Sequence, residues 1–228
     1  MKGGGYRCVL FDLGGVLVRL QAVGPMSQLV GSSSDVEFWS RWLASRWVRD
    51  FERGRCSGSE FAAGIAAEWG MTASVDSFLE AFENWPEALY GGALALVADV
   101  RRAVPVGCLS NSNPLHWSRF ASLWHLDRLF DVRFLSHEMG LVKPDRELFE
   151  HVVERLEAPP ESIVFLDDNQ ANVSAAQEAG LTAVKVSGPS EARRELEKLR
   201  ILSDRLHERD NSLRLPLEGA QTRIPPAS

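Results

Sequence analysis

Short apolar runs alternate with amphipathic stretches along most of this chain. Residues 6–11 form an apolar run that predicts a buried strand, which ends at Asp12-Leu13-Gly14-Gly15. After Pro86 the pattern predicts helices over residues 93–103, 114–124, 144–156 and 171–179, and strands over residues 104–109, 132–135, 162–166 and 182–186. Proline at the start of the helix over 144–156 is favourable, because the first N–H groups of a helix have no partner. The alternation predicts an α/β fold, with a Rossmann-like parallel sheet covered by helices on both faces.

A helical insertion interrupts this pattern after the first strand. Ser34 to Glu37 and Ser57 to Glu60 both match the capping-box pattern, which predicts helix starts within residues 35–88. Five of the seven tryptophans lie in this stretch and favour a small aromatic core. We therefore predict an α/β core over residues 1–20 and 89–202, a helical cap over 21–88, and a poorly ordered tail over 203–228.

Charge and cysteine content narrow the class of protein. The 228 residues carry a formal net charge of -6 and no basic cluster, which argues against a nucleic-acid partner. Cys8, Cys56 and Cys108 form no pair with metal-binding spacing, and they favour a reducing compartment. No apolar run reaches the roughly 18 residues of a membrane span. We expect a cytoplasmic protein that does not bind membranes and is a monomer or homodimer.

Polar residues follow three of the predicted strands at their carboxyl ends, where open parallel sheets place their sites. The first strand ends at Asp12, the next at Ser110-Asn111, and a later one at Asp167-Asp168, while Lys143 precedes the helix over 144–156. Each residue alone has an ordinary interpretation as a turn, cap or surface residue. Their joint placement at one sheet edge favours a catalytic site.

These residue types suit phosphoryl transfer. The Asp12 carboxylate can act as a nucleophile and form an aspartyl-phosphate. A cation must bridge it to the phosphate dianion, and Mg²⁺ prefers oxygen ligands. We predict Asp12, Asp168 and the backbone carbonyl near Gly14 as metal ligands, with Asp167 in an outer position. Lys143 would balance the remaining charge. Three residues are the predicted phosphate donors. They are Ser110, Asn111 and Lys143.

Four segments together resemble the motifs of the haloacid dehalogenase-like superfamily. They are FDLGGV at 11–16, LSN at 109–111, KPD at 143–145 and FLDDN at 165–169, in a match that spans residues 6–186. The motif sequences are most similar to those of bacterial phosphatases that act on α-glucose 1-phosphate. The resemblance implies a capped Rossmann-like core, Mg²⁺ as cofactor, Asp12 as nucleophile and Lys143 as charge-balancing base. It also implies a small phosphorylated metabolite, with a sugar phosphate favoured, as substrate.

Gly14 departs from the superfamily pattern, because most of its phosphatases carry a second Asp at this position. That Asp protonates the leaving oxygen, and general acid–base help is worth roughly 10²–10⁴-fold. Its absence predicts a preference for stabilised leaving groups. It also leaves two alternatives open: an inactive binding protein, and a metal-independent 2-haloacid dehalogenase with Arg19 as its carboxylate clamp. The Asp167-Asp168 pair argues against the dehalogenase, because it would repel a carboxylate substrate.

Three further side chains are candidates for roles near the site. Arg53, in the segment from Phe51 to Arg55, could grip a substrate if a turn of the insertion reaches the site, and a charged helix end is an equal alternative. His116 and His137 lie near the motifs and could replace the missing acid. For both histidines, a surface or packing role is the favoured interpretation.

Overall fold

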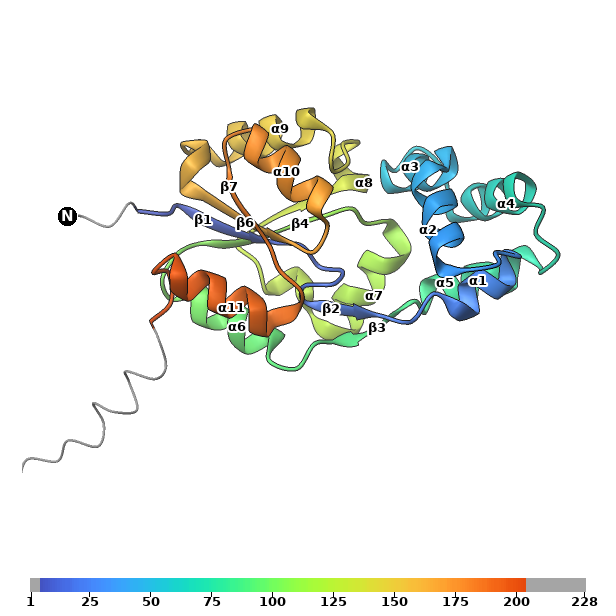
Figure 1. Ribbon diagram of the computed structural model, residues 1–228, viewed down its shortest axis with the longest axis horizontal. Coiled ribbons are helices and arrows are strands. Elements are labelled where there is room, and N and C mark those ends of the chain that lie inside the picture. Colours follow the sequence, from blue (N-terminus) through green and yellow to red (C-terminus); the bar gives the residue numbers. More distant parts are fainter. Residues whose placement is uncertain (1–4, 204–228) are drawn as a thin grey trace, which may run out of the picture.

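Five parallel strands form the centre of the larger part of the molecule (Figure 1). The computed structural model describes residues 5–203, so the predicted tail lies outside the described residues from position 204 onward. The strands run in the order β5-β4-β1-β6-β7. They are β1 (Cys8–Phe11), β4 (Val106–Ser110), β5 (Val132–Leu135), β6 (Ile163–Asp167) and β7 (Thr182–Lys185). β1 lies between β4 and β6, so the residues after these three strands meet at one edge.

Helices cover both faces of this sheet, as the alternating pattern predicted. One face packs on α6 (Ala93–Arg101), α7 (Pro114–Trp124) and α11 (Gly188–Lys198), and the other on α9 (Arg146–Leu156) and α10 (Gln170–Glu178). Side chains alternate between the two faces of a strand. Accordingly Val9 and Phe11 join the first cluster of buried residues, and Cys8 and Leu10 join the second. The predicted α/β Rossmann-like fold is confirmed.

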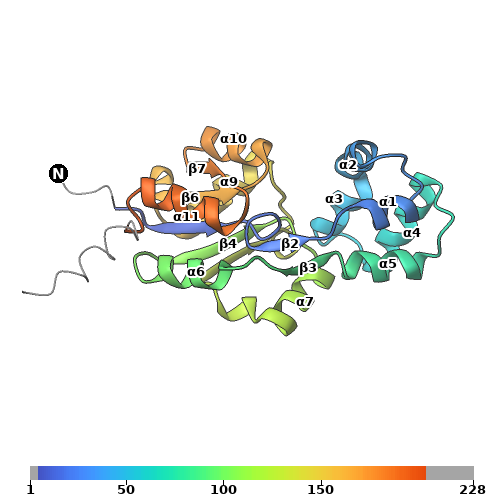
Figure 2. The ribbon, with the colours of Figure 1, turned by 60° about the horizontal axis from the view of Figure 1, so that its bottom comes forward.

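Five of the remaining helices form a second body beside the carboxyl edge of the sheet (Figure 2). They are α1 (Gly24–Leu29), α2 (Asp35–Ala44), α3 (Arg46–Glu52), α4 (Gly58–Trp69) and α5 (Val75–Glu83). Their aromatic side chains pack on each other; Phe51 and Phe61 stack with ring centroids 4.6 Å apart. This cluster of buried residues is separate from the two clusters that flank the sheet.

Two short strands connect the two bodies. β2 (Val18–Leu20) and β3 (Pro86–Leu89) pair in antiparallel fashion and form a ribbon at the base of the helical body. The periodicity predicted neither strand, because each is too short to show alternation. In the part of the chain after β3, three short helices also went unpredicted; they are α8 (Ser136–Met139), η1 (Leu126–Arg128) and η2 (Pro160–Ser162).

The predicted helix start is confirmed at α4, whereas α2 and α9 differ from the predictions in part. Ser57 and Glu60 form the full capping box at the start of α4. At α2 the Ser34 side chain caps the helix, but the Glu37 carboxylate accepts from the Ser33 N–H. Pro144 does not start α9, because the N-cap is Asp145 and the helix begins at Arg146.

The cysteines lie as their apolar surroundings predicted. Cys8 and Cys108 are buried in β1 and β4, and all three cysteines are free thiols. Burial raises the pKa of both buried thiols to about 12, so they act as small apolar side chains. None of the helices within residues 5–203 has the length and apolar character needed to cross a lipid bilayer.

Candidate active site

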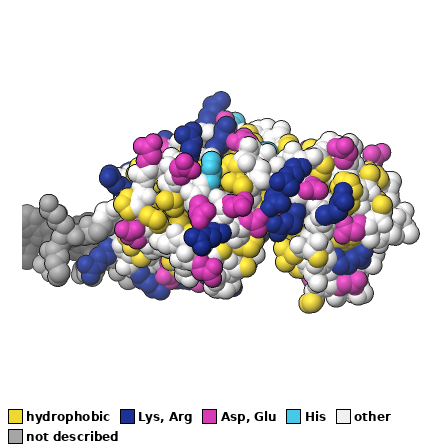
Figure 3. Space-filling model, turned by 90° about the horizontal axis from the view of Figure 1, so that it is seen from above, with side chains coloured by type: hydrophobic (Ala, Val, Ile, Leu, Met, Phe, Trp, Pro, Cys, Tyr) yellow, Lys and Arg dark blue, Asp and Glu magenta, His cyan; other side chains and the backbone are white. Residues whose placement is uncertain are grey.

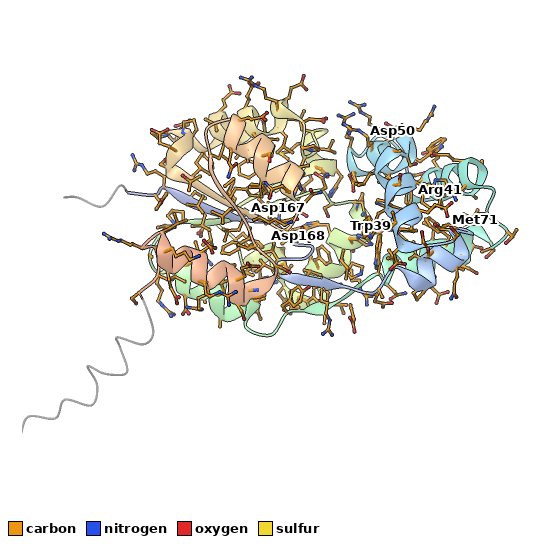
Figure 4. The ribbon with its side chains drawn as sticks, viewed as in Figure 1. Trp39, Arg41, Asp50, Met71, Asp167 and Asp168 are labelled. Carbon is orange, nitrogen blue, oxygen red and sulfur yellow. The ribbon has the colours of Figure 1, made fainter. Side chains whose placement is uncertain are left out.

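Three acidic side chains converge where β1 and β6 end. Ligand oxygens of Asp12, Asp167 and Asp168 all lie within 4.8 Å of one another. Figure 4 shows Asp167 and Asp168 at the end of β6 that faces the helical body. Strand order explains this convergence, because β1 and β6 are neighbours and run parallel. Residues separated by more than 150 positions are thereby brought to one edge of the sheet.

Asp12 is buried among groups that restrict its carboxylate. Its Oδ1 accepts the backbone N–H of Leu13 at 2.7 Å and lies 3.0 Å from the Lys143 ammonium. Burial, with the neighbouring Asp167 and Asp168, raises the pKa of Asp12 to about 7 against the opposing effect of Lys143. The carboxylate is thus held in place, and its ionised form requires positive charge nearby.

Lys143 supplies part of that charge from a fully enclosed position. Its Nζ donates to Asp167 Oδ2 at 2.6 Å and to the Leu109 carbonyl at 3.1 Å. Burial alone would lower the pKa of Lys143, but Asp12 and Asp167 outweigh burial and raise it above its ordinary value. The lysine is therefore charged, and one ammonium stands among three carboxylates.

Asp167 differs from the other two acids because the protein occupies both of its oxygens. Oδ1 accepts the Asn169 N–H at 2.7 Å, and the Asn172 side chain donates to Oδ1 and Oδ2 at 3.1 and 3.0 Å. This arrangement suits a group that orients Lys143. Asn172, which lies on the first turn of α10, was not singled out by the sequence. Its position five residues after Asp167 is the signal that could have found it.

Asp168 lies against the backbone of Gly15. A Cβ at Gly15 would lie 2.0 Å from Asp168 Oδ2, and this glycine has φ +70°. Burial and the neighbouring Asp167 both raise the pKa of Asp168. Gly15 is thus required here both for its conformation and for the close approach of the acid. The sequence showed the Gly-Gly pair, but not the partner across the sheet edge.

The donor set fits a hard divalent cation. Three carboxylates and one ammonium leave net negative charge at this edge of the sheet, and carboxylate oxygens are the ligands that Mg²⁺ prefers. The raised pKa values of Asp12 and Asp168 point the same way, because a bound cation favours ionised acids. The pair formed by Asp12 and Asp168 would hold the ion, since Asp167 is committed to Lys143 and Asn172.

Ser110 and Asn111 follow β4 at the same edge. The Ser110 side chain is buried, and its hydroxyl donates to the Asn111 carbonyl at 3.3 Å. The Asn111 amide holds Lys143: Oδ1 accepts the Lys143 N–H at 2.8 Å, and Nδ2 donates to the Lys143 carbonyl at 3.0 Å. The Asn111 side chain therefore positions the lysine backbone, and the role of Asn111 as a phosphate donor stays a prediction.

A cavity of about 160 Å³ separates these strand ends from the helical body. The core contributes Gly14, Ser110 and Asn111 to its wall, and the helical body contributes mainly aromatic side chains, with Trp39 at an exposed position. Figure 4 places Trp39 on the part of α2 nearest the core. Glu52, at the end of α3, adds a carboxyl group, and its Oε2 accepts from Asn111 Nδ2 at 3.3 Å.

Arg53 does not face this cavity. Arg49 and Arg53 both pair with Asp145, at 2.9 and 2.5 Å, and so connect α3 to the start of α9. Figure 3 shows basic side chains gathered on the surface where the helical body meets the core. Beside them, a Cβ at Gly54 would lie 2.4 Å from the His137 carbonyl, so the turn after α3 touches the core backbone. The turn after α3 therefore reaches the core. The Arg53 side chain in this turn forms an ion pair with Asp145.

His116 and Arg19 take structural positions. His116 Nε2 lies 2.6 Å from the Phe82 carbonyl and its Nδ1 lies 3.1 Å from Asn113 Nδ2, so the neutral ring joins α7 to α5. Burial lowers the pKa of His116 to about 4. Arg19, the candidate clamp of a dehalogenase, is 53% exposed and pairs with Glu87 across the β2–β3 ribbon. The described residues that line the cavity do not include His137.

Comparison with known proteins places this site in a family. A model of the haloacid dehalogenase-like hydrolases matches residues 6–180. The chain is 24% identical over 197 residues to a D-ribitol-5-phosphate phosphatase of Bacteroides thetaiotaomicron, which covers 82% of this chain and 95% of that protein. It is 31% identical over 207 residues to acyl-CoA dehydrogenase family member 10 of Mus musculus, where the match covers 86% of this chain but 19% of the mouse protein.

A solved structure agrees with the sequence matches. It is a HAD family enzyme of Bacteroides thetaiotaomicron in complex with magnesium and inorganic phosphate, with a TM-score of 0.67 and 26% identity. The superposition covers 79% of this chain and 94% of that one. The expectation of Mg²⁺ as cofactor is confirmed at the level of these relatives. With the family model spanning most of the sequence, the chain belongs to the haloacid dehalogenase-like hydrolases.

Proposed function

We propose that this protein is a magnesium-dependent phosphatase that hydrolyses a small phosphorylated metabolite through an aspartyl-phosphate on Asp12. The observation that carries the proposal is the convergence of Asp12, Asp167 and Asp168 within 4.8 Å around the Lys143 ammonium. A phosphate dianion can approach Asp12 only where positive charge offsets the carboxylates. A lysine and a divalent cation together provide that charge.

Each residue at the strand ends has one task in this reaction. Asp12 attacks phosphorus with the oxygen that is not engaged by Leu13 and Lys143, which both contact Oδ1. Lys143 and the Ser110 hydroxyl bind phosphoryl oxygens, together with the backbone N–H of Asn111. Asp167 keeps the ammonium in position through its 2.6 Å contact. Water then attacks the phosphoryl group and releases Asp12.

Magnesium would be held by Asp12, Asp168 and the carbonyl near Gly14. When bound, the ion screens the negative charge between nucleophile and phosphate and stabilises charge that develops on the phosphoryl oxygens. The cap in this proposal comprises residues 21–88, and the core comprises residues 1–20 and 89–202. Closure of the cap over the site would exclude bulk water from the reacting groups.

Two substrate classes fit the cavity between cap and core. A sugar phosphate follows from the sequence resemblance, and the D-ribitol-5-phosphate phosphatase of Bacteroides thetaiotaomicron supports it. A phosphate ester of an aryl or apolar alcohol is favoured by the aromatic wall, to which Trp39, Trp42 and Trp85 contribute. Apolar walls stabilise bound apolar groups, whereas sugar hydroxyls require hydrogen-bonding partners.

A substrate screen with and without Mg²⁺ tests the proposal. We expect Mg²⁺-dependent release of phosphate from p-nitrophenyl phosphate and from members of a sugar phosphate panel, and we expect Asp12→Asn to abolish both. A flat response across the panel would support the inactive binding protein instead. Chloride release from 2-chloropropionate in EDTA would support the dehalogenase, for which Arg19 offers no clamp because it pairs with Glu87.

A further inference from the structure

The proposed reaction needs a proton donor that position 14 does not supply. When a phosphorus–oxygen bond to an alkyl or sugar oxygen breaks, the departing oxygen is strongly basic. A positioned acid accelerates such a step by roughly 10²–10⁴-fold. Gly14 has no side chain, and a Cβ there would meet only Leu20, at 3.7 Å.

The leaving oxygen must lie on the cap side of the phosphoryl group. Attacking and leaving oxygens are roughly in line in phosphoryl transfer. Asp12 attacks from the end of β1, so the leaving group points away from the sheet. The cavity that opens there is bounded by Gly14 and Asn111 from the core and by α3 from the cap. The donor should therefore be sought on the wall of this cavity.

Glu52 is placed on that wall. Among the described residues that line the cavity, it alone carries a carboxyl group. Its Oε2 accepts a hydrogen bond from Asn111 Nδ2 at 3.3 Å. The same Asn111 amide holds the backbone of Lys143, whose Nζ lies 3.0 Å from Asp12. One residue thus separates the Glu52 carboxyl from the groups assigned to the phosphate.

On the basis of the phosphatase function above, we propose that Glu52 donates the proton to the leaving oxygen in place of the acid that Gly14 lacks. The cap thereby contributes a catalytic residue to the core. A carboxyl at this place serves both half-reactions, since water enters from the side that the leaving group has vacated.

The two steps balance in bonds and protons. In the first, an Asp12 oxygen forms a bond to phosphorus, the bond to the leaving oxygen breaks, and that oxygen takes the proton of the Glu52 carboxyl and departs as an alcohol. In the second, water bonds to phosphorus, Glu52 takes a water proton, and the bond to Asp12 breaks. Inorganic phosphate leaves, and Asp12 and Glu52 return to their starting states.

The electrostatic setting keeps a proton available at Glu52. Burial raises the pKa of its carboxyl to about 7, against the opposing effects of Lys143, Arg49 and the Asn111 hydrogen bond. A pKa near the working pH suits an acid that must also act as a base. The other titratable group on the cavity wall is His116, and its two ring nitrogens are engaged with Phe82 and Asn113.

The test compares leaving groups in Glu52→Gln. Glutamine has nearly the shape of a protonated glutamate but cannot transfer the proton. We expect kcat/KM for glycerol 3-phosphate to fall about 10²–10³-fold, and for p-nitrophenyl phosphate less than about tenfold, because nitrophenolate departs without protonation. Glu83→Gln, which removes an exposed carboxylate of α5, is the matched control and should change neither value.

A second variant keeps the outcome decisive. A Cβ at Gly14 has room, so Gly14→Asp in the Glu52→Gln background should restore turnover of glycerol 3-phosphate at least tenfold. Equal losses on both substrates, or no loss on glycerol 3-phosphate, would overturn the role of Glu52. Failure of the phosphatase function itself has a different signature: the unaltered protein would then release no phosphate from p-nitrophenyl phosphate with Mg²⁺.

Discussion

Two adjacent glycines follow Asp12, and a side chain would meet different surroundings at each. At Gly15 a methyl group would collide with Asp168 in a backbone of φ +70°, whereas at Gly14 it would meet only Leu20. We expect Gly15→Ala to lower the free energy of unfolding by about 1–3 kcal/mol and to weaken Mg²⁺ binding. Gly14→Ala is the matched control and should change both little. Urea unfolding and calorimetric titration of Mg²⁺ provide the two values, and equal results for both variants would contradict the close approach at Gly15.

Glu52 makes the pH dependence of turnover specific to the leaving group. Its pKa is raised to about 7, and a general acid works only while protonated. Turnover of glycerol 3-phosphate should therefore fall as pH rises through about 7. This fall in turnover with rising pH should be small with p-nitrophenyl phosphate, and it should be absent in Glu52→Gln. An unchanged fall in turnover in that variant would show that another group titrates in this pH range.

At the scale of elements, α3 joins cap to core through a charged contact. Arg49 and Arg53 both reach Asp145, and Arg49 is 40% exposed, so solvent screening weakens its share. We expect Asp145→Asn to lower the free energy of unfolding by about 1 kcal/mol or less, yet to speed amide exchange in α3. Hydrogen–deuterium exchange measures this. In the control Glu150→Gln, which breaks an exposed pair within α9, α3 should exchange as in the unaltered protein.

The elements that the sequence predicted well are those whose boundaries depend on local chemistry. β6 reads as an apolar run, and α4 starts at a Ser57–Glu60 capping box that the structure contains in full. The β2–β3 ribbon has no such signal, because its pairing joins residues almost seventy positions apart. The start of α9 was predicted at Pro144, but the helix begins at Arg146, with Asp145 as its N-cap.

Local chemistry likewise determined which parts of the site were predictable. Asp12, Ser110 and Asp168 follow apolar strands, and the rule for parallel sheets brings strand ends together. Glu52 could not be assigned in this way, because its position depends on how the cap packs on Asn111. The segment from Phe51 to Arg55 was a candidate for reaching the site. Which of its side chains faces the cavity is a property of tertiary packing.

At the scale of the whole molecule, His116 couples the cap to the core. Its ring contacts the Phe82 carbonyl of α5, and its pKa is lowered to about 4. The unfolded chain therefore binds a proton near pH 6.5 that the folded protein takes up only near pH 4. Stability is complete above pH 6.5 and falls as pH decreases toward 4, by about 2 kcal/mol at pH 5. His116→Gln should reduce this slope in urea unfolding, whereas the exposed His125→Gln should preserve it.

The β2–β3 ribbon has a mechanical consequence. The chain passes from core to cap along one strand and returns along the other, and hydrogen bonds tie the two passages side by side. Paired strands resist independent sliding but permit a bend, so a bend of this ribbon would move the two strands together. Opening by such a bend would swing the entire cap as one lever. The opening that admits the substrate would then also separate Glu52 from Asn111. Glu52 could donate its proton only when the cap is closed.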